Sequence, residues 1–116
     1  MSITYYHNPK CSKSRAGLAI LQEQNIDAEL RLYLEDPLSI EELNKIVAKL
    51  GIKPIEIARK KEAAEVGITA DMSDDEIIAI LSQNPHVIER PILEIDEKAT
   101  VGRPTENIIQ LIDEAL

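Results

Sequence analysis

The sequence predicts an α/β domain built on a small mixed β-sheet and interrupted by a helical segment. Three observations support this: the chain begins with a β-α-β pattern, helical patterns fill the middle, and it ends with a β-β-α pattern. A length of 116 residues suits one compact domain, and 44% apolar residues are enough for a core. That core must be largely aliphatic, because the chain has no Phe or Trp and three Tyr.

The first third of the chain predicts strand, helix and strand. The segment 3–6 is rich in β-prone residues, and His7-Asn8-Pro9 interrupts it. A helix is predicted from about Ser12 to Gln24, and Asn25 can end it. Residues 28–34 alternate between apolar and polar, which predicts a half-buried strand whose inner face consists of Ala28, Leu30, Leu32 and Leu34.

Two capping boxes begin helices in the middle of the chain. Ser39, followed by glutamate three positions later, begins a helix that Gly51 ends. Residues 54–66 predict short helical pieces, and Ser73, again with glutamate three positions later, begins a helix that Asn84-Pro85 ends. The predicted buried faces consist of Ile40, Leu43, Ile46, Val47 and Leu50 in the first helix, and of Ile77, Ile80 and Leu81 in the second.

The last third predicts a hairpin and a helix. Residues 92–95 form a predicted strand, and 98–102 its antiparallel partner. Pro104 suits the first turn of a final helix, whose apolar positions are Ile108, Leu111, Ile112 and Ala115. The whole order is typical of a single thioredoxin-like domain over 1–116, a mixed β-sheet with flanking helices and a helical insertion at approximately 38–84.

Charge and composition narrow the classes of partner. Thirteen basic and twenty-one acidic residues give a net charge of −8, which disfavours nucleic acid and anionic membranes. The chain shows no membrane span and no signal peptide, and its single cysteine cannot form an intrachain disulfide, so a cytoplasmic protein is expected. Most of the cations fall in four short segments that either form one basic pocket or are solvated separately: Lys10, Lys13 and Arg15; Arg59, Lys60 and Lys61; Arg90; Arg103.

Cys11 is the candidate nucleophile. It lies at or just before the first helix and beside Lys10 and Lys13, so the helix N-terminus, these cations, and donors such as Ser14 should lower its pKa. The alternative is a small buried core residue. Because the chain has one cysteine, any disulfide must be mixed with an external thiol, which excludes enzymes that relay oxidation through several cysteines of their own.

The sequence resembles the ArsC-type, glutaredoxin-linked arsenate reductases over essentially its whole length. Five segments in order carry the resemblance: Tyr6-His7-Asn8-Pro9-Lys10-Cys11-Ser12-Lys13-Ser14-Arg15, Tyr33-Leu34-Glu35-Asp36-Pro37, Arg59-Lys60, Asn84-Pro85 through Arg90-Pro91-Ile92, and Gly102-Arg103-Pro104. The resemblance implies that Cys11 attacks arsenic and that Arg59, Arg90 and Arg103 bind the arsenate. Guanidinium groups suit that task, although each arginine could instead form an ordinary surface ion pair.

The resemblance also implies supporting residues and partners. The supporting residues are His7, Ser14, Arg15 and Pro91, and the Arg90–Pro91 bond is expected to be cis and to direct Arg90 toward Cys11. His7 would favour the thiolate or orient its loop, or else it merely ends the strand. No bound cofactor and no metal are expected. Glutathione is the expected thiol co-substrate, glutaredoxin the protein partner, and a monomer the expected state.

Two other functions remain open on the sequence alone. The first is a related glutathione-dependent thiol reductase with another substrate. The second is a Spx-like transcription regulator that binds RNA polymerase, since regulators of that kind share the superfamily. Many Spx proteins carry a Cys-x-x-Cys switch, and here Ser14 stands at its second position. Together with the complete set of three arginines, this favours the enzyme.

Overall fold

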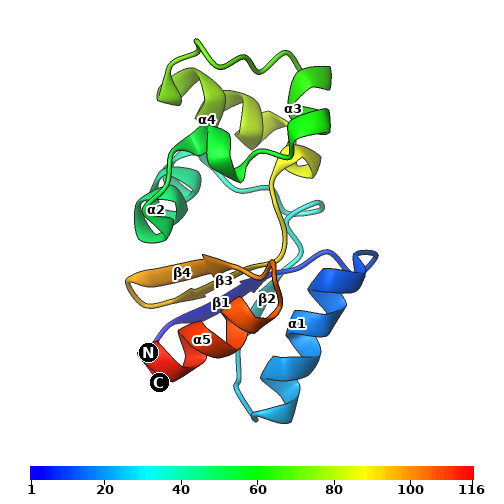
Figure 1. Ribbon diagram of the computed structural model, residues 1–116, viewed down its shortest axis with the longest axis vertical. Helices are drawn as coiled ribbons and strands as arrows, with labels where there is room; N and C mark the ends of the chain where they lie inside the picture. The colour runs from blue at the N-terminus through cyan, green and yellow to red at the C-terminus, as the bar shows by residue number, and fades with distance from the viewer. The chain divides into compact units, whose positions relative to one another are not determined.

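The protein is described by a computed structural model that covers all residues, Met1 to Leu116, in two compact units (Figure 1). The first unit consists of Met1–Tyr33 and Arg90–Leu116, and the second of Leu34–Glu89. The helical insertion predicted for approximately 38–84 falls within the second unit. No helix in either unit combines the length and the apolar character that crossing a membrane requires.

The first unit contains a four-stranded mixed sheet in the order β2-β1-β3-β4. The strands are β1 (Ile3–Tyr6), β2 (Glu29–Arg31), β3 (Ile92–Ile95) and β4 (Lys98–Val101). β1 runs parallel to β2, while the β1–β3 and β3–β4 pairs are antiparallel. A parallel pair needs a crossover, and helix α1 (Ser12–Glu23) supplies it. The mixed sheet predicted from the sequence is therefore present.

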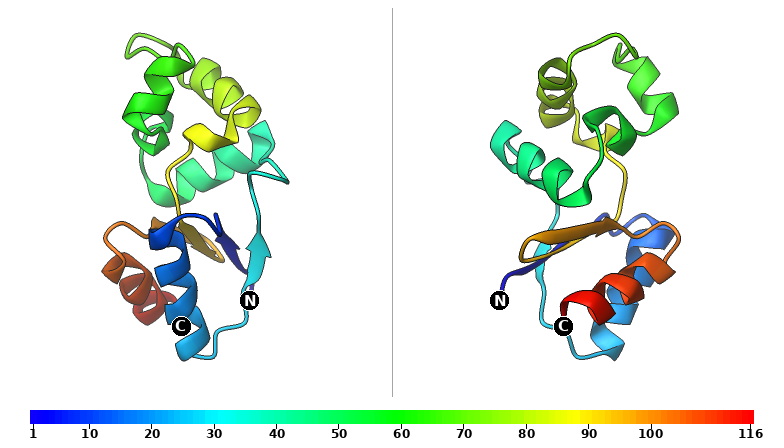
Figure 2. Two further views of the ribbon diagram at one scale, coloured as in Figure 1. Left: turned by 90° about the vertical axis from the view of Figure 1, so that its right-hand side faces the viewer. Right: turned by 60° about the vertical axis from the view of Figure 1, so that its left-hand side comes forward.

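Helices α1 and α5 (Glu106–Ala115) cover the same face of this sheet (Figure 1, Figure 2). The strand register places Tyr5 opposite Leu93 and Ile3 opposite Ile95, so these four side chains share that face. The core between sheet and helices consists of Tyr5, Leu21, Leu93, Ile95, Ile108, Leu111 and Ile112. Tyr5 is fully buried, and it is the one aromatic residue of this otherwise aliphatic core.

The second unit is helical, as predicted. It contains α2 (Ile40–Leu50), the short 3₁₀ helices η1 (Pro54–Ile57) and η2 (Pro85–Val87), α3 (Lys60–Glu65) and α4 (Asp74–Gln83). Both capping boxes form, and Gly51 ends α2 in the left-handed conformation with φ of 68°. The buried residues of α2 and α4 are Leu43, Ile46 and Val47, and Ile77, Ile78 and Leu81.

Three details of the predicted helix faces are wrong, the first being that Leu50, the last residue of α2, is only partly buried. Ile40 is 48% exposed. It is the first residue of α2, so no preceding helical turn lies beside its side chain to shield it from solvent. In α4, Ile78 is buried in addition to Ile77 and Leu81, while Ile80 is only partly buried. Ile78 and Ile80 lie next to the correctly predicted Ile77 and Leu81, so the periodicity located the buried face of α4 to within one residue.

The strand predicted over 28–34 is shorter than expected, and its predicted inner face is wrong. β2 spans Glu29–Arg31 alone, with Leu30 47% and Leu34 42% exposed. β2 is an edge strand that pairs only with β1, and Leu34 already belongs to the second unit. Leu30 lies opposite the buried Tyr5, yet at the edge of the sheet it stays exposed, so alternation predicts which residues share a face but not how far that face is covered.

The start of the last helix also differs from the prediction. α5 begins at Glu106, with Thr105 as its N-cap, so Pro104 precedes the helix instead of occupying its first turn. The Arg103–Pro104 bond is cis, which the sequence analysis did not predict. The Arg90–Pro91 bond is also cis, as predicted. Both bonds lie beside arginines of the candidate site.

Candidate active site

Cys11 occupies the junction between β1 and α1. It is the N-cap residue of α1, with extended backbone angles of −93° and 124°. Its backbone N–H donates to the carbonyl of Asn8 at 3.0 Å, and its carbonyl accepts from the N–H of Arg15 at 3.0 Å. The thiol is free and partly exposed. This position does not fit the alternative of a buried core cysteine, and it leaves the sulfur accessible to a reactant.

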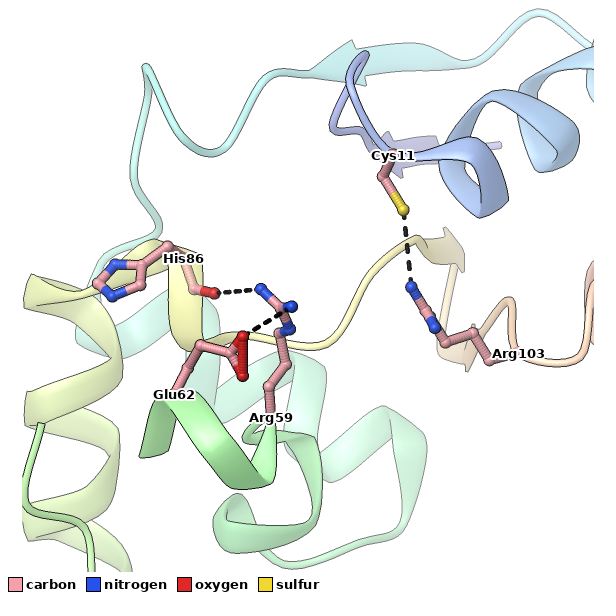
Figure 3. A network of polar contacts seen from close by, with 5 residues as sticks. All are labelled: Cys11, Arg59, Glu62, His86 and Arg103. Carbon is pink, nitrogen blue, oxygen red and sulfur yellow. Dashed lines mark hydrogen bonds and ion pairs between the residues drawn. The ribbon is translucent and has the colours of Figure 1, made fainter. Parts of the chain in front are cut away.

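The surroundings of Cys11 favour the thiolate. Burial alone would raise the pKa of the thiol, but the backbone N–H groups of Ser14 and Lys13 and the charges of Arg90 and Arg103 lower it below its ordinary value. Both N–H groups belong to the first turn of α1, whose N–H groups form the positive end of the helix dipole. Arg103 is the direct partner: its Nη2 donates to Sγ at 3.6 Å (Figure 3).

Arg103 is itself held in place by the segment that contains Arg90. The Nε of Arg103 donates to the carbonyl of Arg90 at 2.7 Å, and the backbone N–H of Gly102 donates to the carbonyl of Pro91 at 2.8 Å. A Cβ at Gly102 would lie 2.9 Å from both Pro91 Cγ and Ile108 Cδ1, so a larger residue does not fit here without displacement. These contacts join the two predicted arginine segments of the first unit beside Cys11.

Ser14 stabilises the loop that precedes Cys11. It is fully buried; its hydroxyl accepts from the backbone N–H of Asn8 at 2.9 Å and lies 3.0 Å from Nδ1 of His7. Its carbonyl accepts from the hydroxyl of Tyr5 at 2.6 Å. The hydroxyl of Ser14 is thus engaged with the segment before Cys11. The group of Ser14 that lowers the pKa of Cys11 is its backbone N–H.

His7 is buried and is held as a neutral side chain. Burial lowers its pKa, and the charge of Arg15 lowers it further. Because the Ser14 hydroxyl already accepts from Asn8, its proton is available to donate to Nδ1 of a neutral imidazole. Arg15 completes the loop by donating from Nη1 to the carbonyl of Pro9 at 2.9 Å. Of the two roles expected for His7, this geometry supports orientation of the loop.

Arg59 belongs to the second unit, so its predicted part in binding the oxyanion stays a prediction. It is the N-cap residue of α3. Its Nη2 forms an ion pair with Glu62 at 2.8 Å, and its Nη1 donates to the carbonyl of His86 at 3.1 Å (Figure 3). The Arg59 side chain is 29% exposed. His86 is exposed, as predicted.

Sequence reasoning missed several residues that support the site. The sequence predicts a turn at Asn8 and a strand at Tyr5, but not the hydrogen bonds that both residues make with Ser14. Gly17 was not singled out, yet a Cβ there would lie 2.2 Å from the Tyr5 hydroxyl, so glycine lets α1 approach β1 closely. Asn107 contacts the turn that contains Arg103. None of these roles follows from a repeating spacing: the contacts of Asn8 and Asn107 span only four to six positions, but they depend on the folded course of two irregular loops, and Gly17 is required by the space beside Tyr5.

Comparison with known proteins agrees with this architecture. A Haemophilus influenzae protein named arsenate reductase is 37% identical over 116 residues, covering 97% of this chain and 100% of that protein. The solved arsenate reductase of Vibrio cholerae has a TM-score of 0.86 at 37% identity and covers 100% of this chain and 98% of its own. A solved chain from Yersinia pestis has a TM-score of 0.90 at 34% identity, covering 94% of this chain and 99% of that one. These structures confirm the predicted thioredoxin-like fold.

The family model gives the same result along the chain. The model of the ArsC family matches residues 6–111, a span that contains Cys11 and all three predicted arginines. It begins at the end of β1 and ends within α5. The chain therefore belongs to the ArsC family.

Proposed function

We propose that this protein is an arsenate reductase that uses Cys11 as its nucleophile and takes its electrons from glutathione and glutaredoxin. One observation carries the proposal: the guanidinium of Arg103 lies 3.6 Å from Sγ of a partly exposed cysteine at a helix N-terminus. A thiolate beside a forked cation is suited to attack an anionic centre such as arsenate. The relatives named as arsenate reductases support the same substrate.

The first step is a substitution at arsenic without change of oxidation state. The thiolate of Cys11 attacks As(V), an As–S bond forms, and one As–O bond breaks with the oxygen leaving as water after protonation. Negative charge remains on the other oxygens throughout. Arg103 and Arg90, whose charges already stabilise the thiolate, would balance that charge, and Arg59 would join them as the family motif implies.

The reduction itself requires external thiols, because the chain contains one cysteine. The glutathione thiol forms a second As–S bond and displaces another oxygen as water. The glutaredoxin thiolate then attacks the glutathione sulfur, and the electron pair of that As–S bond passes to arsenic, reducing As(V) to As(III). The products are a glutaredoxin–glutathione disulfide and arsenite bound to Cys11, which water releases as free arsenite and the thiol.

The test is an assay of NADPH consumption with arsenate, glutathione, glutaredoxin and glutathione reductase. Wild-type protein is expected to turn over, and Cys11→Ser to be inactive although folded. Omission of either glutathione or glutaredoxin should also abolish turnover. If the wild-type protein is inactive with arsenate but reduces a glutathione mixed disulfide, the proposed substrate is wrong and the related thiol reductase is the correct assignment.

A further inference from the structure

Asn107 makes contacts that none of the functions above uses. It lies in the first turn of α5, and its side-chain Nδ2 donates to the carbonyl of Val101 at 3.1 Å and to the carbonyl of Arg103 at 3.2 Å. One amide group thus binds two carbonyls that lie on either side of Gly102. These two hydrogen bonds connect α5 to the last residue of β4 and to the segment between β4 and α5.

This connection has few other means of being held. It follows the last residue of β4 and precedes α5, so it lies outside the regular hydrogen bonds of both elements. Within it, the N–H of Gly102 donates to the carbonyl of Pro91 and the carbonyl of Pro104 accepts from the backbone N–H of Asn107 at 3.0 Å, while Pro104 has no N–H to donate. The carbonyl of Val101 also accepts from the Thr100 hydroxyl at 3.3 Å.

The orientation of the Arg103 side chain depends on this backbone. Its Nε donates to the carbonyl of Arg90 and its Nη2 donates to Sγ of Cys11, so two of the three guanidinium nitrogens have defined partners. A guanidinium with fixed partners reaches them only if its own Cα is correctly placed. Asn107 binds the carbonyl of that same residue.

We propose that Asn107 is a positioning residue, which acts on Cys11 through Arg103 by fixing the backbone of the turn that contains Arg103. The expected effect on arsenate turnover rests on the proposed function. The expected effect on the pH dependence of Cys11 alkylation rests on the geometry alone. Asn107 supplies two N–H donors from a short, rigid side chain. An aspartate of the same shape has no donor and would face both carbonyls with negative charge.

The experiment compares Asn107→Ala and Asn107→Asp with Gln110→Ala, a matched control at an exposed position of the same helix. Each protein is examined by the pH dependence of Cys11 alkylation, by arsenate turnover and by thermal unfolding. Both Asn107 variants should shift the alkylation midpoint to higher pH and lower kcat/KM about tenfold, since a small displacement of a catalytic group is costly. Gln110→Ala should behave as wild type in all three measurements.

A double-mutant cycle with Arg103→Ala separates positioning from general stability. In the Arg103→Ala background, Asn107→Ala should have no further effect on the alkylation midpoint. An equal effect in both backgrounds, or a wild-type midpoint in both Asn107 variants, overturns the proposal. Alkylation requires no arsenate, so a protein inactive with arsenate still tests the position of Arg103. If Asn107→Ala does not fold, Asn107→Asp, which preserves the size of the side chain, provides the same comparison.

Discussion

Arg103 and Cys11 are separated by 92 positions in the chain, and Nη2 of the arginine donates to Sγ of the cysteine at 3.6 Å. The contact joins the N-terminus of α1 to the turn before α5, two segments that the sheet of the first unit brings together. The arginine is positioned by the carbonyl of Arg90, on the segment that leads into β3. The chemistry of the cysteine therefore depends on three separate parts of the chain.

The pKa of the Cys11 thiol should lie below that of a free cysteine, about 8.5. The sign follows from the surroundings: burial raises the pKa, and the N–H groups of the first turn and two arginine charges outweigh it. The rate of alkylation by iodoacetamide against pH measures this value. Arg103→Ala should move the midpoint upward and Arg103→Lys less so, because lysine retains the charge without the fork. A wild-type midpoint at or above that of a free cysteine contradicts the assignment.

Loss of any one of the three arginines should impair turnover. Arg59→Ala, Arg90→Ala and Arg103→Ala should each lower kcat/KM for arsenate by roughly 10-fold or more, because a hydrogen bond to a charged group contributes about 1.5–3 kcal/mol. Lysine at each position should restore activity in part. Lys45→Ala, an exposed position on α2, is the control, and circular dichroism checks the fold. Wild-type kcat/KM in all three alanine variants would show that the substrate binds elsewhere.

Gly17→Ala should destabilise the protein, against the usual preference of helices for alanine. Alanine gains about 1 kcal/mol of helix propensity over glycine, but its Cβ would lie 2.2 Å from the Tyr5 hydroxyl, and overpacking costs about 1–3 kcal/mol. Tyr5→Phe removes that oxygen, after which the nearest ring atom is 3.2 Å away.

The free energy of unfolding in denaturant tests the pair. Tyr5→Phe alone should cost about 1 kcal/mol, because it removes the hydrogen bond to the Ser14 carbonyl. Gly17→Ala should cost markedly less in the Tyr5→Phe background than in the wild type, a non-additive result expected for residues in contact. Equal costs in both backgrounds would mean that the hydroxyl is not what excludes a side chain at position 17.

His7 should make stability fall as the pH is lowered toward acid values. Its pKa is lowered in the folded state by burial and by Arg15, so the unfolded chain takes up a proton first, at about pH 6.5. The unfolded state then binds more protons, and the free energy of unfolding declines from about that pH down to the folded-state pKa.

Asn can replace Nδ1 as a partner for the Ser14 hydroxyl without titrating. His7→Asn should therefore show a shallower loss of stability than the wild type between about pH 7.5 and 5.5. The matched control is His86→Asn, at an exposed histidine of the second unit. A wild-type slope in His7→Asn would mean that His7 is not held neutral.

The sequence by itself determined the features that depend on neighbours within a few residues. A capping box needs a serine and a glutamate three positions apart, so both Ser39 and Ser73 were correctly predicted to begin helices. The periodicity of Ile108, Leu111 and Ile112 likewise predicted the buried face of α5. The position of Cys11 between a strand and a helix was also predicted, because the β-prone residues 3–6 precede it and the predicted helix from about Ser12 follows it.

Only the tertiary structure decided which faces of these elements are covered and which side chains contact one another. The alternation in 28–34 was real, yet Leu30 is exposed because β2 lies at the edge of the sheet. The Ser14 hydroxyl binds His7 and Asn8, and Asn107 binds the turn at Arg103, by contacts that no spacing in the sequence encodes. Helix and strand signals depend on a regular repeat of adjacent residues, whereas these contacts depend on the irregular course of two loops. The contact of Arg103 with Cys11, across 92 positions, depends on which segments the folded chain brings together, and that is set by the packing of the whole unit.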